Sequence, residues 1–244
     1  IDAGNDKVEV TLDNVNIKAG SGSALTSKGD VTLTLKGDNH LTGGISDTGN
    51  YGRNGIASTG SLTITGGENG SLTAQGGSGA DGGHGGHGIY SNGSLTISGG
   101  STVTANGGNG GSLVGGDGIR SGGGLTVSDG TVTAKGGNGD SKDGYGGDGI
   151  RSGGVVTISG NTVNAAGGYG GKVGGYGICS FDRVAISGGT VEAAGGNGST
   201  GGGSGIYSSV IDLSGSLELT AKAGSPNGKA LSQNGKELDL DTIN

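Results

Sequence analysis

The 244-residue sequence contains no tryptophan and no methionine, and only one phenylalanine, one proline and one cysteine. Aromatic residues make up 3% of the chain and hydrophobic residues 29%, so the side chains for one large globular core are lacking. The single Cys179 excludes an internal disulfide. No apolar run approaches the roughly 20 residues that cross a bilayer, so we expect no membrane insertion. Because methionine is absent even at position 1, we expect that a preceding segment has been removed.

Positive charge is also scarce. Lys and Arg number 14 against 21 Asp and Glu, which gives a formal net charge of −7. The basic residues are scattered and form no stripe, so we expect neither nucleic acid nor an anionic membrane surface as a partner. An acidic surface rich in Ser and Thr favours an extracellular or cell-surface protein.

Glycine, in contrast, accounts for 66 residues. Such a glycine fraction is typical of disordered chains when no period is present. Here a period is present, because an isoleucine or leucine that we call the landmark recurs every 25 to 33 residues. The landmarks are Leu25, Ile56, Ile89, Ile119, Ile150, Ile178, Ile206 and Leu231. A period near thirty residues predicts a solenoid.

Each repeat holds three short strands. After the landmark Ile119 come residues 125–127 and then 131–134, and apolar residues alternate with threonines in both segments. This period of two places the apolar side chains on one face, and no segment has a helical period. Strands this short are stable only when successive turns stack, about 4.8 Å apart, and share one interior. We therefore predict an all-β, single-stranded parallel β-helix of about eight turns with glycine-rich loops. It is expected to form a single domain over residues 1–244, in which 1–22 are an N-terminal cap turn and 208–244 the C-terminal turns.

The glycine-rich loops between the third strand and the next landmark pose an energetic problem. Ordering a residue costs about 1 to 2 kcal/mol of backbone entropy, and glycine loses more than most residues. Hydrogen bonds or bound ions are therefore expected to stabilise the loops. The segment Gly-Gly-Asn-Gly recurs around Asn109, Asn138 and Asn197, which predicts a ladder of stacked asparagines.

The residue after each landmark points outward in the predicted fold and gives a line of side chains that we call the strand row. The strand row consists of Ala57, Tyr90, Arg120, Arg151, Cys179 and Tyr207. Aromatic faces and guanidinium groups suit sugar rings and uronate carboxylates, so Tyr90, Arg120, Arg151 and Tyr207 are candidate carbohydrate-binding residues. The alternative is a solvated sheet face that carries large residues. Cys179 is expected to be a surface or partly shielded thiol without a catalytic role.

The residue two positions before each landmark gives a second line, the loop row. The loop row consists of Asn54, His87, Asp117, Asp148, Tyr176 and Ser204. Stacked Asp117 and Asp148 repel each other unless a cation or an arginine intervenes. With the loop residues Asp81 and Asp143 and glycine carbonyls they could form an oxygen-only shell suited to Ca²⁺. The alternative is neutralisation by Arg53, Arg120 or Arg151.

Catalysis needs carboxylates, Lys or Arg in a cleft. Because the turns are nearly uniform, we expect no walls around these residues and hence a non-catalytic protein. A lyase-like set of Arg120 and Arg151 with Asp117 and Asp148 is the alternative. Outward Thr-x-Thr pairs, such as Thr102 with Thr104, resemble those of ice-binding solenoids, but Asn164 and Glu192 interrupt the row.

The repeat unit, seen at residues 88–91, 95–100 and 103–105, resembles that of the clostridial and Firmicutes carbohydrate-binding β-helix proteins, which are pectate-lyase-like solenoids. The resemblance implies a right-handed, secreted β-helix that binds calcium and a plant-wall polysaccharide such as polygalacturonate or cellulose. The absence of tryptophan disfavours cellulose. Our leading hypothesis is a secreted or cell-surface, calcium-assisted module that binds acidic or plant-wall polysaccharide. The alternatives are a structural spacer or adhesin repeat with a host-surface protein as partner, and a polysaccharide lyase.

Overall fold

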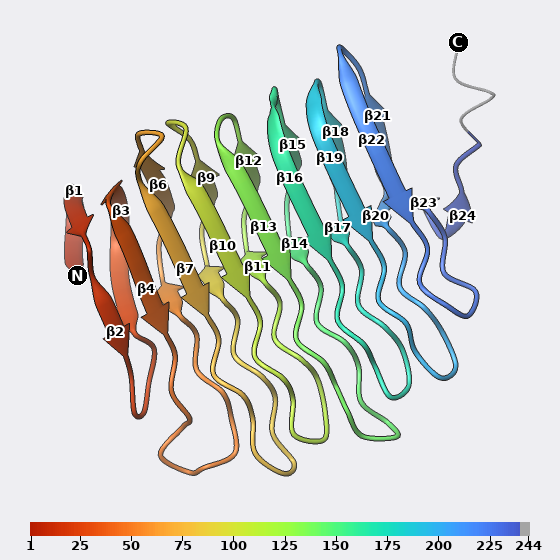
Figure 1. Ribbon diagram of the computed structural model, residues 1–244, viewed down its shortest axis with the longest axis horizontal. Coiled ribbons are helices and arrows are strands. Elements are labelled where there is room, and N and C mark those ends of the chain that lie inside the picture. The colour runs from red at the N-terminus through yellow and green to blue at the C-terminus, as the bar shows by residue number, and fades with distance from the viewer. Residues whose placement is uncertain (240–244) are drawn as a thin grey trace.

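The computed structural model describes residues 1–239, in which parallel strands of successive repeats stack into a β-solenoid of about eight turns (Figure 1). The predicted all-β parallel solenoid is therefore confirmed, whereas its right-handed winding stays a prediction from the resemblance. The described residues hold no helix, and thus none that is long and apolar enough to span a membrane.

Each turn has three faces, which we number in the order that the chain passes them after a landmark. Faces 1 and 2 belong to one 16-stranded sheet because the long strand β3 (Leu25–Lys36) runs through both, and face 3 is an eight-stranded sheet. Face 1 also contains β5 (Ile56–Ser58), β8 (Ile89–Ser91), β11 (Ile119–Ser121), β14 (Ile150–Ser152), β17 (Ile178–Ser180), β20 (Ile206–Ser208), β23 (Leu231–Gln233) and, antiparallel to it, β24 (Lys236–Glu237). Face 2 adds β1 (Asp2–Asp13), β6 (Leu62–Gly66), β9 (Leu95–Ile97), β12 (Leu125–Val127), β15 (Val156–Ile158), β18 (Arg183–Ile186) and β21 (Val210–Leu213). Face 3 consists of β2 (Asn16–Lys18), β4 (Asp38–Thr42), β7 (Ser71–Gln75), β10 (Thr102–Asn106), β13 (Thr131–Lys135), β16 (Asn161–Ala166), β19 (Gly189–Ala194) and β22 (Leu217–Lys222).

The landmark residues pair with one another from turn to turn, as the sequence predicts. Ile119 pairs with Ile89 on one side and with Ile150 on the other, and the same register continues from Leu25 to Leu231. The landmarks from Ile56 to Ile206 have no exposed surface, and they form one continuous interior with the apolar residues of faces 2 and 3. The thin, repeated core therefore comes from rows of identical or similar side chains.

A row of buried serines lies two positions after the landmarks. The hydroxyl oxygen of Ser121 lies 3.0 Å from the carbonyl oxygens of both Gly93 and Gly124, so its single hydrogen is shared between these two acceptors. Ser152 donates in the same way to Gly123 at 2.8 Å. These carbonyls also accept backbone amides of a neighbouring turn, so the buried hydroxyls find their partners at the bend between faces 1 and 2.

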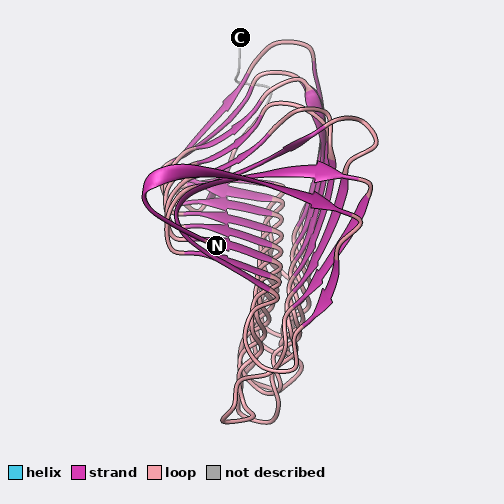
Figure 2. Cartoon of the chain, turned by 90° about the vertical axis from the view of Figure 1, so that its left-hand side faces the viewer, coloured by secondary structure: helices cyan, strands magenta, loops and turns pink. Residues whose placement is uncertain are grey.

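The loops from face 3 to the next face 1 project together as a narrow extension, which we call the glycine fin (Figure 2). Each loop has an outgoing arm and a return arm, so the fin has two layers. Its most regular members are residues 76–88, 107–118, 136–149, 167–177 and 195–205.

Backbone hydrogen bonds connect the two layers of the fin. The amide of Gly116 on a return arm donates to the carbonyl of Gly108 on an outgoing arm, and Gly137 of the next outgoing arm donates to Gly116, both at 2.8 Å. The alternation continues without a break through Gly86, Gly108, Gly116, Gly137, Gly147, Gly168, Gly175, Gly196, Gly203 and Gly224. Hydrogen bonds within the peptide backbone thus stabilise the loops, one of the two means that the sequence predicts.

Within each layer, backbone amides three residues apart donate hydrogen bonds to carbonyl groups of the next turn. Gly107 donates to Lys135 at 2.8 Å and Gly110 to Asn138 at 2.7 Å. Three residues is the repeat of the polyproline II conformation, which makes no hydrogen bonds within its own strand. The arms therefore take most of their backbone partners from the opposite arm and from neighbouring turns.

Glycine is required in the fin because there is no room for a Cβ. An ideal Cβ on Gly108, Gly137 or Gly168 would lie 2.0 Å from the carbonyl oxygen of the preceding outgoing arm. Such a distance is far below any real contact, so a larger side chain forces successive arms of the layer apart. None of these three glycines needs the left-handed backbone conformation, so their role is steric.

The predicted asparagine ladder is present on the outgoing arms. The side-chain carbonyl of Asn109 accepts a hydrogen bond from the amide of Asn138, and that of Asn138 accepts one from the amide of Tyr169, both at 2.9 Å. Asn197 accepts from Ser225 at the same distance. Each asparagine therefore holds the arm of the following turn in register.

We expect Gly137→Ala to lower the free energy of unfolding by at least about 2 kcal/mol, because the new methyl group overpacks the fin and weakens its hydrogen bonds. Gly67→Ala is the matched control, since a Cβ on Gly67 meets nothing within 4 Å. Urea unfolding of both variants measures the difference. Equal stabilities would contradict the steric role of the fin glycines.

Candidate functional site

Where the return arms of the fin meet face 1, three rows of side chains run side by side across the turns. Two are the strand row and the loop row that the sequence predicts. The third, which we call the fin row, lies five positions before the landmarks and consists of Tyr51, His84, Val114, Tyr145, Val173 and Gly201. Its members from Val114 onward form parallel bridges with one another. Because the arms repeat every three residues, the fin row and the loop row point to the same side.

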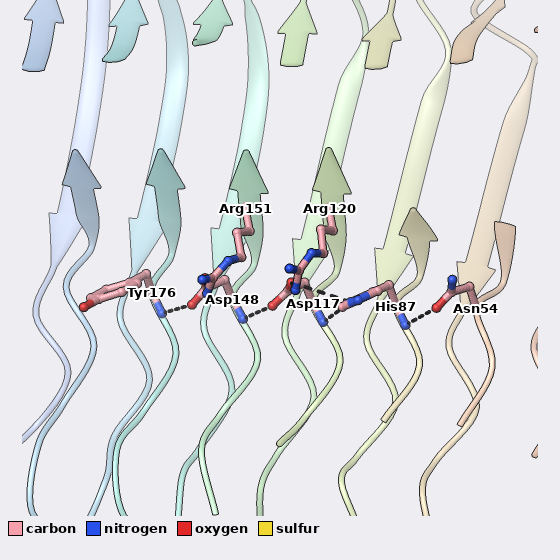
Figure 3. Close-up of polar contacts among 7 residues, drawn as sticks. All are labelled: Asn54, His87, Asp117, Arg120, Asp148, Arg151 and Tyr176. Atoms are coloured by element: carbon pink, nitrogen blue, oxygen red, sulfur yellow. Dashed lines mark hydrogen bonds and ion pairs between the residues drawn. The ribbon is translucent and has the colours of Figure 1, made fainter. Parts of the chain in front are cut away.

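The loop row forms a ladder of hydrogen bonds from side chain to backbone (Figure 3). Nδ1 of His87 accepts from the amide of Asp117 at 2.9 Å, Oδ1 of Asp117 from the amide of Asp148 at 2.8 Å, and Oδ1 of Asp148 from the amide of Tyr176 at 2.7 Å. Oδ1 of Asn54 accepts from His87 in the same way at 2.8 Å. The residue types vary along the row, but Asn54, His87, Asp117 and Asp148 each supply an acceptor at the same place.

Each carboxylate of the loop row also pairs with an arginine of the strand row. Nη1 of Arg120 lies 3.5 Å from Oδ2 of Asp117, and Nη1 of Arg151 lies 3.1 Å from Oδ2 of Asp148. Both aspartates are buried, whereas the side chains of Arg120 and Arg151 remain 44% and 34% exposed. The carboxylates thus have partners at both oxygens, and the arginines keep donors that face solvent.

The four predicted calcium ligands do not converge. Asp117 and Asp148 are neighbours in the loop row, but Asp81 and Asp143 are exposed residues in turns of their own loops. Within residues 1–239, no group of three or more His, Cys, Asp and Glu side chains is placed to hold a metal ion. The residues present therefore do not fit the predicted oxygen shell, and calcium binding stays a prediction.

Burial changes the proton affinity of two loop-row residues. Burial beside the charge of Asp117 raises the pKa of Asp148 to about 7, although Arg151 and the amide of Tyr176 act in the opposite direction. Burial also lowers the pKa of His87. A neutral imidazole agrees with the ladder, because Nδ1 of His87 accepts a hydrogen bond and so carries no proton.

The three rows line a groove along the solenoid axis. A cavity of about 570 Å³ is bordered by Asp117, Asp148, Arg120 and Arg151 on the side of face 1, and by fin-row residues that include Tyr145 on the other. A second hollow of about 340 Å³ shares His87 and Arg120 with the first and extends the groove to Asn54 and Tyr90. The expectation that the turns raise no walls was wrong, because the stacked glycine loops form one wall together.

The strand row has the predicted register. Tyr90, Arg120, Arg151, Cys179 and Tyr207 are paired in this order in five successive turns. Cys179, however, is 1% exposed, so the expectation of a surface or partly shielded thiol was wrong. Its flanking residues in the row are both large, and burial raises the pKa of the thiol to about 12. Cys179 is therefore an inert, packed residue of the row.

Sequence reasoning did not find the fin row or the contacts between rings. Tyr51 stacks on His84 with ring centroids 5.7 Å apart, and the ammonium group of Lys172 lies 5.6 Å from the centre of the Tyr145 ring. The available signal was the recurrence of large side chains five positions before the landmark, in loops that otherwise consist mainly of glycine.

In face 3, Thr104 and Thr133 are followed in register by Asn164 and then Glu192, so the predicted interruption of the threonine row is confirmed.

Comparison with known proteins assigns no family. No family model matches the chain, and no curated protein matches it. Among solved structures, the chain is similar to the crystal structure of an ice binding protein from an Antarctic Biological Consortium, with 15% sequence identity and a TM-score of 0.21 over 86% of this chain and 88% of that one. A likeness at this level carries no argument about function. The resemblance to clostridial carbohydrate-binding proteins stays a prediction.

The raised pKa of Asp148 predicts a pH-dependent stability. Because its folded pKa lies above the ordinary value of 3.8, the stability that protonated Asp148 contributes is fully present below pH 4 and is lost as the pH rises through about 7. Asp148→Asn keeps an acceptor for Tyr176 but does not titrate. We expect the free energy of unfolding of the unaltered protein, minus that of Asp148→Asn, to fall between pH 4 and 7.

The difference between the two proteins cancels the contribution of His87, which both contain. The lowered pKa of His87 has the opposite effect on the free energy of unfolding, which it reduces as the pH falls through 6.5. Asp143→Asn, on an exposed loop turn, is the matched control. Thermal unfolding at several pH values gives both differences. A difference for Asp148→Asn that is independent of pH would refute the raised pKa.

Proposed function

We propose that the groove binds an acidic polysaccharide of the polygalacturonate type without cleaving it, and that the protein works outside the cell or on its surface. The observation that carries this proposal is the pair of neighbouring arginines, Arg120 and Arg151, on the wall of an open groove. A guanidinium has five N–H donors in a fork that matches a carboxylate. Each arginine contacts its aspartate through Nη1 and retains the other donors for a ligand.

The shape of the groove supports a polymer as the ligand. The groove crosses successive turns and is continuous over at least the turns of Tyr90, Arg120 and Arg151. Its fin wall offers the rings of His84 and Tyr145 and the apolar side chains of Val114 and Val173. Sugar rings combine apolar C–H faces with polar edges, so a charged wall opposite a ring-bearing wall suits an acidic glycan better than a neutral one.

The aspartates support binding rather than cleavage. Asp117 and Asp148 each hold a backbone amide of the next turn and an arginine. To act as a base, either carboxylate would have to give up contacts that fix the loop row. We therefore assign them the role of positioning Arg120 and Arg151.

Replacing both arginines by glutamine tests the proposal. We expect the unaltered protein to be retained on immobilised polygalacturonate and released by salt, and Arg120→Gln with Arg151→Gln to lose affinity by a factor of at least about ten for each arginine, since a hydrogen bond to a charged group contributes about 1.5 to 3 kcal/mol. Arg183→Gln is the matched control, because Arg183 pairs with Asp212 on face 2, away from the groove. Thermal unfolding verifies that every variant is folded.

Passage of the folded, unaltered protein through the column without retention would overturn the proposal and favour a spacer or adhesin with a protein partner. Ultraviolet absorbance of the eluate detects the unsaturated products that a lyase releases, and their appearance would replace binding by catalysis. Retention is compared in calcium and in a chelator. The geometry predicts equal retention, whereas loss in the chelator would support the predicted calcium site.

A further inference from the structure

Two pairs of stacked rings lie at either end of the two ion pairs in the groove. The rings of His87 and Tyr90 are 5.8 Å apart with an interplanar angle of 26°. The rings of Tyr176 and Tyr207 are 4.9 Å apart with an angle of 17°. Because the strand row pairs in register, the order along the groove is ring pair, Arg120, Arg151, ring pair.

The second ring pair depends on the small residue between Arg151 and Tyr207. Cys179 occupies this place in the row and is buried. Tyr176, which precedes Cys179 in its own turn, stacks on Tyr207 of the following turn. The ring of Phe181 lies 5.0 Å from the guanidinium carbon of Arg151 and supports it on this side. The ring surface therefore begins directly beside the second arginine.

The spacing of the two arginines determines which sugar units of a bound polymer they can contact. Neighbouring parallel strands are about 4.8 Å apart, which is comparable to the length of one pyranose unit in an extended chain. Arg120 and Arg151 thus face adjacent sugar units rather than alternate ones. Each retains N–H donors for a carboxylate, and their mutual repulsion is offset by Asp117 and Asp148 behind them.

From this order we infer, on the basis of the proposed function, that the groove has consecutive subsites specific for two adjacent uronate units flanked by sugars that pack on the ring pairs. A homopolymer of uronates satisfies both arginines at once. A polymer in which uronates alternate with neutral amino sugars satisfies only one arginine at a time. His87 and Tyr176 join Tyr90 and Tyr207 as specificity-determining residues.

Chain length and charge pattern test the inference. The probes are oligogalacturonates of two to six units and alternating uronate–N-acetylhexosamine oligosaccharides of the same lengths, titrated into the full chain and followed by calorimetry or NMR. We expect affinity to rise by about tenfold or more from the dimer to the tetramer or pentamer and then to level off. At equal length, alternating oligosaccharides are expected to bind about tenfold or more weakly.

Ring variants separate the flanking subsites from the central ones. Tyr90→Ala and Tyr207→Ala are each expected to remove most of the roughly tenfold gain from dimer to pentamer. Tyr169→Ala is the matched control, since Tyr169 is a 45% exposed tyrosine on an outgoing arm, in the asparagine ladder. Its length dependence is expected to stay unchanged.

The outcomes distinguish this inference from the proposed function. Equal affinity for alternating and homopolymeric oligosaccharides, or an unchanged length dependence in both ring variants, would overturn the subsites even though polygalacturonate is bound. No binding of any uronate oligosaccharide by the folded protein would overturn the proposed function itself.

Discussion

The contact between peptide backbones in the glycine fin is the constraint on which the rest of the structure depends. Its two layers approach so closely that a Cβ on Gly107 or Gly136 would lie within 2.0 Å of a carbonyl oxygen of the opposite arm. In return, the amides of the fin find carbonyl partners across and along the layers. Glycine is usually a source of disorder, because it has the most backbone entropy to lose. Here its lack of a side chain allows the hydrogen bonds that order the loops.

The register of the fin also determines the register of the groove. The loop row lies on the return arms, and Gly118, directly after Asp117, donates to the carbonyl of Asp148 at 2.9 Å. The same stacking brings Oδ1 of Asp117 to the amide of Asp148. Two carboxylates can therefore lie in adjacent turns because each is held by a backbone amide and by its own arginine. The charged wall of the groove and the ring-bearing wall opposite it are consequences of one repeated backbone geometry.

Much of this arrangement could be predicted from the sequence, because a solenoid converts a period into rows. The landmark residues, the strand row and the loop row all have the predicted register. The buried position of Cys179 could not be predicted in this way, since the row gives the direction of a side chain and the identity of its neighbours but not whether they cover it. The dispersion of Asp81 and Asp143 depends on the path of each loop, which residue spacing does not specify.

The fin wall was missed for a related reason. A glycine-rich loop considered by itself has no side chains with which to build a wall, and only stacking with its neighbours makes it rigid. Tyr145 and Val114 could have been found at their constant distance from the landmark, but their role depends on the two-layered packing that brings them opposite Arg120 and Arg151.

Amide hydrogen exchange in the presence of a chelator tests the central claim most directly, because it reports the backbone hydrogen bonds of the fin without any substitution. The account predicts that amides of the fin, such as those of Gly116 and Gly137, are protected to about the same degree as those of the strands β11 and β14. Rapid exchange throughout the fin, with protection confined to the strands, would contradict it.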